Sequence, residues 1–337
     1  MAEPIRVVQF GLGPIGCEVV RAVCDRPGLQ LVAAVDVDPA KIGRDAGEIA
    51  GARHLGVAVT ADLGAARAAG AQVALHTTGS YLDQTASQFE ALIEAGLHVV
   101  STCEELAYAQ ALQPETAAHF DALAKERGVA LLGAGVNPGF VFDTLILTAT
   151  AVCQRVERIR ARRVLDAGKR RLPLQQKVGA GLSLAEFKRR VDAGLVRHVG
   201  LAESMRMVTD GLGWQIDRVE EETHPVLATA EQRTPHLTVP AGAVAGVHQI
   251  GRAYVGEREV LNLDLQMYVG APESFDEIEI VGTPPINLRL AGGAPGDPST
   301  AAIAINAIPA LLAGPPGLRS MRDVRLVHCW GQQVSQS

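Results

Sequence analysis

Apolar and polar positions divide the chain into two regions with different periods. In the first 140 residues, short apolar runs alternate with stretches in which apolar residues recur every three or four positions. The runs predict buried strands at 5–10, 31–35, 72–77, 98–102 and 129–134. The stretches predict helices at 17–24, 61–69, 83–95 and 114–127. Alternating strands and helices of this length predict a doubly wound, mostly parallel sheet.

The period changes after about residue 150. Apolar and polar positions then alternate, cleanly or loosely, at 261–267, 277–281 and 286–290. This alternation is typical of an antiparallel sheet with one covered face. Further helices are predicted at 184–191 and 202–212, and a last apolar helix and a strand at 300–312 and 324–329. We expect the last two elements to return to the first region, since glycines and prolines precede them at 292–296.

The first predicted strand runs directly into a glycine-rich turn, and a helix follows it. In such a turn the first glycine permits a tight bend, the second lets the backbone approach a pyrophosphate, and the third allows close packing of helix on strand. The helix N-terminus offers unpaired N–H groups to phosphates. An aspartate 20 residues after the third glycine, Gly16, is placed to accept both hydroxyls of an adenosine ribose. The sequence therefore predicts a dinucleotide site at Gly11, Gly13, Pro14, Ile15 and Asp36.

These patterns predict the fold class. We expect a Rossmann-type doubly wound parallel sheet plus an α+β domain with a mainly antiparallel sheet. Residues 1–140, completed by about 298–337, are predicted to bind the dinucleotide. Residues 141–297 are predicted to bind substrate and to form the contact of a homodimer, through the outward face of their sheet. A length of 337 residues agrees with two domains.

Composition narrows the classes of partner. The net charge of −6 gives no reason to expect nucleic acid or an anionic membrane as a partner. No apolar run approaches the roughly 20 residues of a membrane span, and we expect no signal peptide before the first strand. The five cysteines are scattered and form no C-x-x-C pair. We therefore predict a cytoplasmic protein without a metal site.

Polar residues follow several predicted strands, at the edge where a doubly wound sheet binds its ligands. Thr77 and Thr78 end one strand, and their hydroxyls are candidates for capping a helix or for contacting the ribose and phosphate of a cofactor. Asn137-Pro138-Gly139-Phe140 follows the last strand. Asn137 is predicted to cap the next helix and to bind the nicotinamide amide or the substrate. We place Pro138 and Phe140 beside the substrate.

Glu104 and Glu105 follow the strand at 98–102 and open a helix. Both match a capping box, since Ser101 lies three residues before Glu104 and Thr102 three before Glu105. One of the two is predicted to cap and the other to face the cleft. A partly desolvated carboxylate beside a nicotinamide has a raised pKa and serves as an acid or a base.

Few candidate residues occur in the second region. His198 is a candidate for lining a pocket, although a single histidine is more often structural. Arg160, Arg162 and Arg163 are predicted to lie on a solvated face.

Four stretches together resemble one family across nearly the whole chain. Residues 99–108, 136–143, 198–204 (with 212–214) and 300–309 are similar to segments of 2,4-diaminopentanoate dehydrogenase and of the native amine dehydrogenases. The resemblance implies a nucleotide-binding domain like that of dihydrodipicolinate reductase. It implies NAD(P)-dependent oxidative deamination of an amine, reversible as reductive amination. It also assigns the handling of the amine to Glu104, with Glu105 as the alternate, and adds Thr300 to the residues near the substrate.

Neighbouring families differ at specific residues. Dihydrodipicolinate reductase carries a histidine pair and a D-x-P-S-G-T-like loop that residues 165–171 lack. Sugar dehydrogenases of the glucose-fructose oxidoreductase type use Glu-Lys-Pro where this chain has Glu104-Glu105-Leu106. Three alternatives stay open: a 2,4-diaminopentanoate or other amino-acid dehydrogenase, an imine reductase, and a redox sensor without turnover. An amino-acid enzyme would need a cation such as Arg160, Arg162 or Lys169 near the substrate carboxylate.

The expected cofactor is NAD(H), with some use of NADP(H). The charge of Asp36 repels a 2′-phosphate, whereas Lys41 and Arg44 follow closely and are able to meet one.

Overall fold

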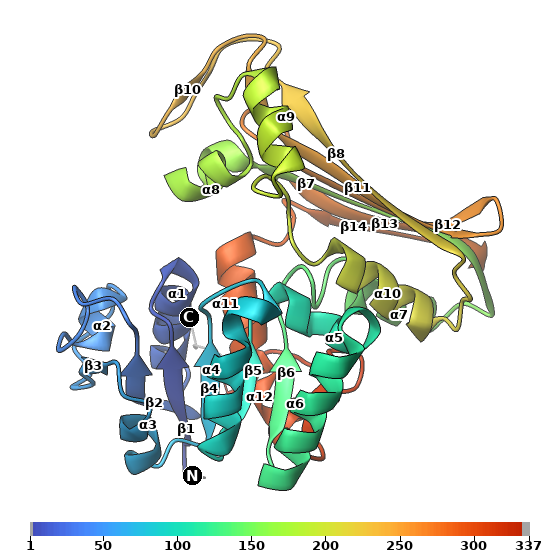
Figure 1. Cartoon of the computed structure of the whole chain (residues 1–337). Helices are drawn as coiled ribbons and strands as arrows, with labels where there is room; N and C mark the ends of the chain where they lie inside the picture. Colours follow the sequence, from blue (N-terminus) through green and yellow to red (C-terminus); the bar gives the residue numbers. More distant parts are fainter. Residues whose placement is uncertain (1–2, 332–337) are drawn as a thin grey trace, which may run out of the picture. The chain divides into compact units, whose positions relative to one another are not determined.

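The computed structural model describes residues 3–331 of the chain, which divides into two compact units (Figure 1). Unit 1 comprises the residues up to Phe140 and those from Pro295 onward, and unit 2 comprises Val141–Ala294. The chain therefore passes from unit 1 into unit 2 and back once.

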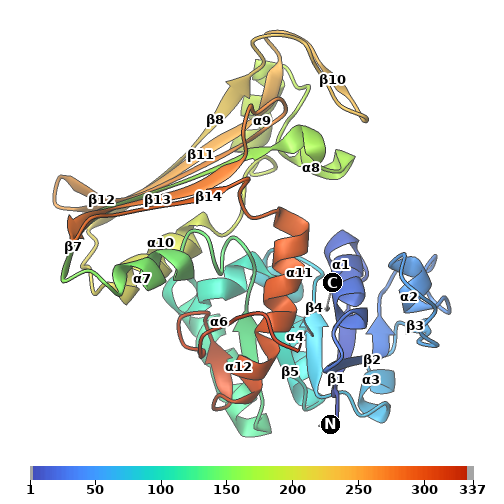
Figure 2. The ribbon, with the colours of Figure 1, turned by 180° about the vertical axis from the view of Figure 1, so that it is seen from behind.

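Unit 1 is built on a seven-stranded sheet in which every neighbouring pair is parallel, in the order β15-β6-β5-β4-β1-β2-β3. Its strands are β1 (Ile5–Phe10), β2 (Leu29–Val35), β3 (Val59–Thr60), β4 (Val73–His76), β5 (His98–Ser101), β6 (Ala130–Gly133) and β15 (Gly317–Arg319). Its helices are α1 (Pro14–Cys24), α2 (Ala46–Ile49), α3 (Gly64–Ala68), α4 (Leu82–Glu94), α5 (Ala109–Leu112), α6 (Pro114–Arg127), α11 (Gly296–Asn306) and α12 (Ile308–Leu312), with a 3₁₀ turn η1 (Glu104–Tyr108). Figures 1 and 2 show helices on both faces of this sheet.

The core of unit 1 consists of two apolar clusters, one on each face of the sheet. Neighbouring strand residues alternate between them, so that Val7 belongs to one cluster and Val8 to the other. The first cluster includes side chains of α1, α11 and α12, and the second includes those of α3, α4 and α6. A strand covered on both faces is apolar throughout, which is why these strands read as continuous apolar runs.

Unit 2 contains a six-stranded mixed sheet in the order β14-β13-β7-β12-β11-β8, in which β7 and β12 are parallel and the other pairs antiparallel. Its strands are β7 (Arg155–Asp166), β8 (Arg218–Leu227), β11 (Val244–Val255), β12 (Arg258–Tyr268), β13 (Phe275–Thr283) and β14 (Ile286–Ala291), and β9 (Gln232–Arg233) pairs with β10 (Thr238–Val239). Its helices are α7 (Thr144–Thr150), α8 (Leu172–Lys177), α9 (Leu184–Asp192) and α10 (Leu201–Gly211), with a 3₁₀ turn η2 (Ala167–Lys169).

One face of the unit 2 sheet is covered and the other is polar. A Cβ placed on Gly251 of β11 would lie 2.7 Å from the sulfur of Met205, so α10 packs directly on that strand. Leu261, Leu263 and Leu265 of β12 are fully buried. The expected fold class is confirmed: a Rossmann-type parallel sheet with helices, and a separate, mainly antiparallel sheet.

The predicted C-terminal elements require correction. The helix expected at 300–312 is two helices, α11 and α12, separated at Ala307. Pro309 has no N–H for the carbonyl of Ile305, and the indole N–H of Trp330 donates to that carbonyl at 3.3 Å instead. The strand expected at 324–329 is absent; the sheet is completed by β15 beside β6, whereas Val324 and Val327 pack against the core. The prediction of this strand from its apolar positions alone was therefore wrong.

Within residues 3–331, the helices are all too short or too polar to cross a membrane.

Candidate active site

The glycine-rich turn lies at the carboxyl end of β1 and leads into α1. Gly11 has φ of +89°, a left-handed backbone conformation that favours glycine. A Cβ on Gly16 would lie 2.0 Å from the carbonyl oxygen of Gly11, so the fold allows no side chain there. A Cβ on Gly13 would meet no atom within 4 Å. The packing therefore requires glycine at position 16, whereas Gly13 faces open space.

The N-terminus of α1 is available to an anion. No side chain caps the helix at Gly13, and Pro14 occupies the first helical position. The first N–H groups of a helix have no partner within the helix, and the aligned peptide dipoles give this end a partial positive charge. Open space at Gly13 and an uncapped helix end fit the diphosphate of a dinucleotide.

Asp36 follows β2, and its carboxylate is held by three donors. The N–H of Leu12 donates to Oδ2 at 2.6 Å, the N–H of Asp38 to Oδ1 at 2.9 Å, and Lys41 Nζ to Oδ2 at 3.0 Å. Burial acts to raise the pKa of Asp36, but these hydrogen bonds outweigh it and hold the pKa below its ordinary value. The carboxylate is therefore ionised and fixed to the glycine-rich turn.

The two threonines after β4 support the turn and the neighbouring helix. The Thr77 hydroxyl donates to the carbonyl of Gly11 at 2.9 Å. The Thr78 hydroxyl donates to Gln88 Oε1 at 2.6 Å, from the loop to α4. Their predicted contacts with a cofactor remain predictions.

Gln9 is a residue of this site that the sequence analysis missed. Its side chain is fully buried, and its amide nitrogen donates to the Gly11 carbonyl at 2.7 Å and to Thr77 Oγ1 at 2.9 Å. Its Oε1 accepts no hydrogen bond from the part of the chain that the structure describes. A polar residue next to last in a buried strand was the available signal. Val37, next to Asp36, was also missed; it is 85% exposed, which is unusual for valine.

The two glutamates after β5 are the first residues of η1, and the contacts of Glu105 are those of a structural residue. Glu105 Oε2 accepts the N–H of Leu82, the first residue of α4, at 2.7 Å and the side-chain amide of Gln113 at 2.9 Å. Neither predicted capping box forms, because η1 begins after Cys103 without a side-chain cap. Glu105 instead stabilises the start of a different helix. Glu104 is the partly buried first residue of η1.

The Asn137–Phe140 turn does not open a helix, so the predicted helix cap at Asn137 is wrong. The next helix, α7, begins at Thr144 and is capped by Asp143, whose carboxylate accepts the N–H of Thr144. The Asn137–Pro138 peptide is cis, a turn conformation. Asn137 is 8% exposed. This buried turn follows β6 at the carboxyl edge of the unit 1 sheet.

Thr300 is brought to the same edge from the far end of the sequence. It lies on α11, and a Cβ placed on Gly135 would be 3.9 Å from its methyl carbon. Phe140 is partly buried and Pro138 is buried. The edge therefore assembles the predicted residues of unit 1 from β1, β2, β4, β5, β6 and α11.

His198 belongs to unit 2 and is partly buried. Its backbone N–H donates to Gln249 Oε1 at 2.8 Å, and its carbonyl accepts from Gln249 Nε2 at 3.0 Å. A fully buried side chain of β11 therefore fixes the backbone at His198. A role for its ring with substrate stays a prediction.

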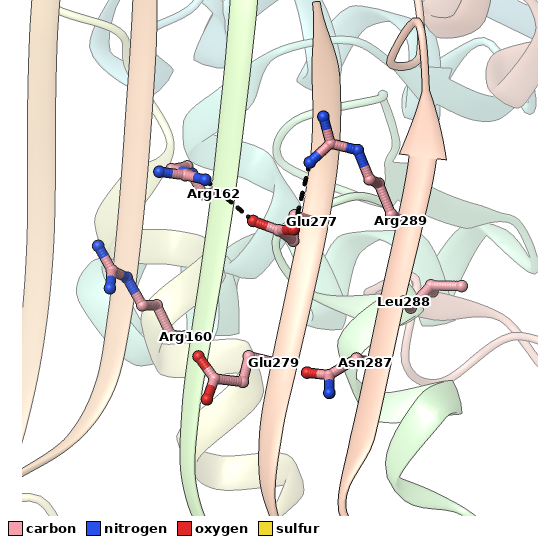
Figure 3. Close-up of a pocket in the computed structure, with 7 residues that line it drawn as sticks. All are labelled: Arg160, Arg162, Glu277, Glu279, Asn287, Leu288 and Arg289. Atoms are coloured by element: carbon pink, nitrogen blue, oxygen red, sulfur yellow. Dashed lines mark hydrogen bonds and ion pairs between the residues drawn. The ribbon is translucent and has the colours of Figure 1, made fainter.

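The three arginines of β7 differ from one another. Arg162 and Glu277 pair at 3.1 Å across the polar face, where Arg160 and Arg289 line the same shallow hollow (Figure 3). Arg163 contradicts the predicted solvated face. It is 2% exposed, and its guanidinium donates to Asp276 Oδ1 at 2.6 Å and to the Ala294 carbonyl at 2.6 Å. Successive strand residues point to opposite faces, which is why Arg163 turns inward.

One group of side chains in residues 3–331 has metal-ligand spacing: Asp45, Glu48 and His54. The Asp45 carboxylate already accepts N–H groups of Gly47, Glu48, Leu55 and Val57. Its geometry is that of the cap of α2. All five cysteines are free thiols.

Two family models match the sequence. The N-terminal domain of dihydrodipicolinate reductase matches residues 5–118, and the C-terminal domain of 2,4-diaminopentanoate dehydrogenase matches residues 140–337. The 2,4-diaminopentanoate dehydrogenase of Acetoanaerobium sticklandii is 30% identical over 340 residues, covering 96% of this chain and 94% of that protein. The amine dehydrogenase of Streptomyces virginiae is 28% identical over 241 residues, covering 70% of this chain and 65% of that protein.

A solved structure agrees over the whole length. The amine dehydrogenase from Mycobacterium smegmatis aligns with a TM-score of 0.86 and 26% sequence identity, covering 98% of each chain.

Proposed function

The chain belongs to the 2,4-diaminopentanoate dehydrogenase family, and we propose that it is an NAD(P)-dependent amine dehydrogenase. It catalyses the oxidative deamination of an amine and, in reverse, the reductive amination of a carbonyl compound with ammonia. Membership of the family confirms the resemblance predicted from the sequence.

The observation that carries the proposal is the set of groups at the carboxyl edge of the unit 1 sheet. Parallel strands end at one edge, and ligands of doubly wound sheets bind there. This edge holds a dinucleotide turn, an ionised aspartate, a carboxylate and a buried amide: Gly11–Gly16, Asp36, Glu104 and Asn137. The same edge would therefore hold the hydride donor and carry a group for acid–base chemistry.

The turn fits a nicotinamide dinucleotide. Gly13 and the N-terminus of α1, with Pro14 and Ile15, would hold the diphosphate, and Asp36 would hold the adenosine ribose, with Thr77, Thr78 and Asn137 toward the nicotinamide. The bound cofactor supplies or accepts the hydride. NAD(H) is preferred, because Asp36 and Asp38 share the single cation of Lys41, at 3.0 and 3.5 Å, and their net charge repels a 2′-phosphate. Lys41 permits some use of NADP(H).

Glu104 performs the acid–base steps. When a carbonyl compound condenses with ammonia, the carboxyl group of Glu104 gives a proton to the departing water. The resulting carboxylate then stabilises the iminium ion. Hydride transfer gives the neutral amine, which takes a proton from water, and the carboxylate holds the resulting ammonium ion. Glu105 is the alternate candidate, and its carboxylate accepts two hydrogen bonds within the fold.

Other residues shape the site. Asn137, Pro138, Phe140 and Thr300 of unit 1 are assigned to the substrate, and His198 of unit 2 is a separate candidate for contact with it. The polar face of the unit 2 sheet, with its Arg162–Glu277–Arg289 ion pairs, is the proposed surface of a homodimer (Figure 3). The free cysteines favour the cytoplasm.

The test is turnover of NADH or NADPH with ammonium and a panel of carbonyl compounds, and of NAD or NADP with amines. The panel includes simple aldehydes and ketones, 2-oxo acids and, in the oxidative direction, 2,4-diaminopentanoate. Ammonia-dependent turnover of carbonyls without a carboxylate supports an amine dehydrogenase. Turnover confined to oxo acids or to 2,4-diaminopentanoate would replace it with an amino-acid dehydrogenase, and bound NADH without turnover would refute the proposal.

Matched variants test the assignment of Glu104. Glu104→Gln is expected to lower kcat by about 10²–10⁴-fold, the usual contribution of a general acid or base, with an unchanged dissociation constant for NADH. Glu105→Gln keeps an acceptor oxygen for Leu82 and Gln113 and is expected to retain turnover. Equal losses in both variants, or full activity of Glu104→Gln, would remove Glu104 from the mechanism.

A further inference from the structure

His76, the last residue of β4, is buried at the centre of a hydrogen-bond chain that the proposed mechanism does not use. Its ring lies between Phe10, at 5.5 Å, and Phe89, at 4.6 Å between ring centroids. Nδ1 is 2.9 Å from the hydroxyl of Ser101, the last residue of β5. Nε2 is 2.8 Å from Gln88 Oε1 on α4. The ring therefore connects the ends of two strands with a helix.

The partners determine the direction of every hydrogen bond in this chain. Gln88 Oε1 only accepts, and the Thr78 hydroxyl, 2.9 Å from Nε2, gives its own proton to Gln88 Oε1, so Nε2 carries the ring proton. Nδ1 then accepts the hydroxyl proton of Ser101. Burial lowers the pKa of His76 to about 4, so the ring is neutral at neutral pH and keeps this tautomer. The polar groups that face the ring, on Ser101, Gln88 and Thr78, are uncharged.

The chain ends at the segment that carries Glu104. The Ser101 hydroxyl oxygen accepts the N–H of Cys103 at 3.0 Å, and Cys103 immediately precedes η1. The N–H of Thr102 donates to the carbonyl of His76 at 3.0 Å. Since η1 has no side-chain cap, these bonds hold the residues just before Glu104.

We propose that His76 and Ser101 are positioning residues for Glu104. They fix the turn from β5 into η1 and so set where the Glu104 carboxylate lies relative to the dinucleotide turn. Both side chains are fully buried and so have no surface to offer to substrate or cofactor. The inference rests on the proposed catalytic role of Glu104, and it adds that the orientation of this carboxylate depends on a buried neutral imidazole rather than on a helix cap.

Ser101→Ala tests the proposal with little change of volume. It removes the acceptor of the Cys103 N–H and the donor to His76 Nδ1. Expected results are faster amide hydrogen exchange in residues 102–108, a kcat about tenfold lower and an unchanged dissociation constant for NADH. Ser101→Thr keeps the hydroxyl and is expected to recover most of the wild-type kcat and most of the wild-type protection from exchange in residues 102–108. Thr209→Val, which removes a buried hydroxyl of α10 in unit 2, is the control for loss of stability alone.

The outcomes separate this inference from the proposed function. An inactive wild-type enzyme would refute the function, and hydrogen exchange would still decide whether Ser101 holds the segment. An active wild type, with exchange and kcat unchanged in Ser101→Ala, would overturn the positioning role. The positioning role would also be overturned if Thr209→Val, at the same loss of thermal stability, lost as much kcat as Ser101→Ala.

Discussion

Gly13 and Gly16 lie three residues apart in one turn, yet alanine is expected to have different effects at the two positions. At Gly16 the new Cβ would lie 2.0 Å from the Gly11 carbonyl oxygen, 2.8 Å from Thr77 Oγ1 and 2.9 Å from Gln9 Nε2. The nearest atom belongs to the backbone, so relief requires α1 and the turn to move apart by about 1 Å. Overpacking of this kind costs ~1–3 kcal/mol, and a backbone clash belongs at the upper end.

The Gly16→Ala variant is therefore expected to unfold earlier. A loss of about 3 kcal/mol corresponds to a fall in Tm of roughly 6–12 °C for a unit of this size. Gly13 has φ of −69° and ψ of −173°, which alanine adopts without strain, and open space around it. Gly13→Ala should keep its Tm, within about 0.5 kcal/mol of stability. It should weaken NADH binding at least about tenfold, or ~1.4 kcal/mol, because its methyl group would occupy the space assigned to the diphosphate.

Thermal unfolding of the proteins without cofactor and fluorescence titration with NADH measure the two effects separately. A wild-type Tm for Gly16→Ala would show that the turn relaxes freely, which contradicts the packing argument. Wild-type NADH affinity of Gly13→Ala would mean that the diphosphate does not approach this residue, and the assigned cofactor position would be wrong.

Three further predictions concern charged and titratable groups. Lys41→Met should raise the dissociation constant of NADPH about tenfold more than that of NADH, because the variant leaves Asp36 without its cation at 3.0 Å; equal changes in a titration would contradict this. Arg163→Met should cost ~3–5 kcal/mol in urea unfolding, since it strands the buried Asp276 carboxylate, and a loss below 1 kcal/mol would count against the pair. His76 has a folded pKa of about 4 against 6.5 for the unfolded chain, so the unfolded chain takes up the proton first; stability is complete above pH 6.5 and falls toward pH 4, by about 2 kcal/mol at pH 5. In His76→Gln, the free energy of unfolding in urea should differ less between pH 7 and pH 5, by that amount. An unaltered difference would show that His76 does not cause it.

Much of unit 1 was predictable because its signals are local. A strand that is covered on both faces must be apolar, and a turn that meets a phosphate needs glycine at fixed spacing. The first strand, the glycine-rich turn and Asp36 therefore appeared where the structure has them. The boundaries were less certain: α1 begins at Pro14, because proline is favoured at the first position of a helix.

Non-local contacts explain what the sequence alone did not determine. Ser101 and Thr102 each precede a glutamate by three residues, so spacing was unable to distinguish the two acids. The N–H of Leu82, brought to Glu105 across 23 residues, shows that Glu105 stabilises the start of α4. Trp330 satisfies the carbonyl at the break between α11 and α12 in the same way, from 25 residues away.

The sequence by itself determined which residues are able to carry the chemistry: a dinucleotide turn, an aspartate after the second strand and a pair of glutamates after the strand at 98–102. Only the tertiary structure decided that Glu105 stabilises the start of α4, that Arg163 is buried beside Asp276, and that Thr300 lies near Gly135. Spacing along a chain records local geometry, whereas the environment of a carboxylate or a guanidinium depends on groups that folding brings from distant positions.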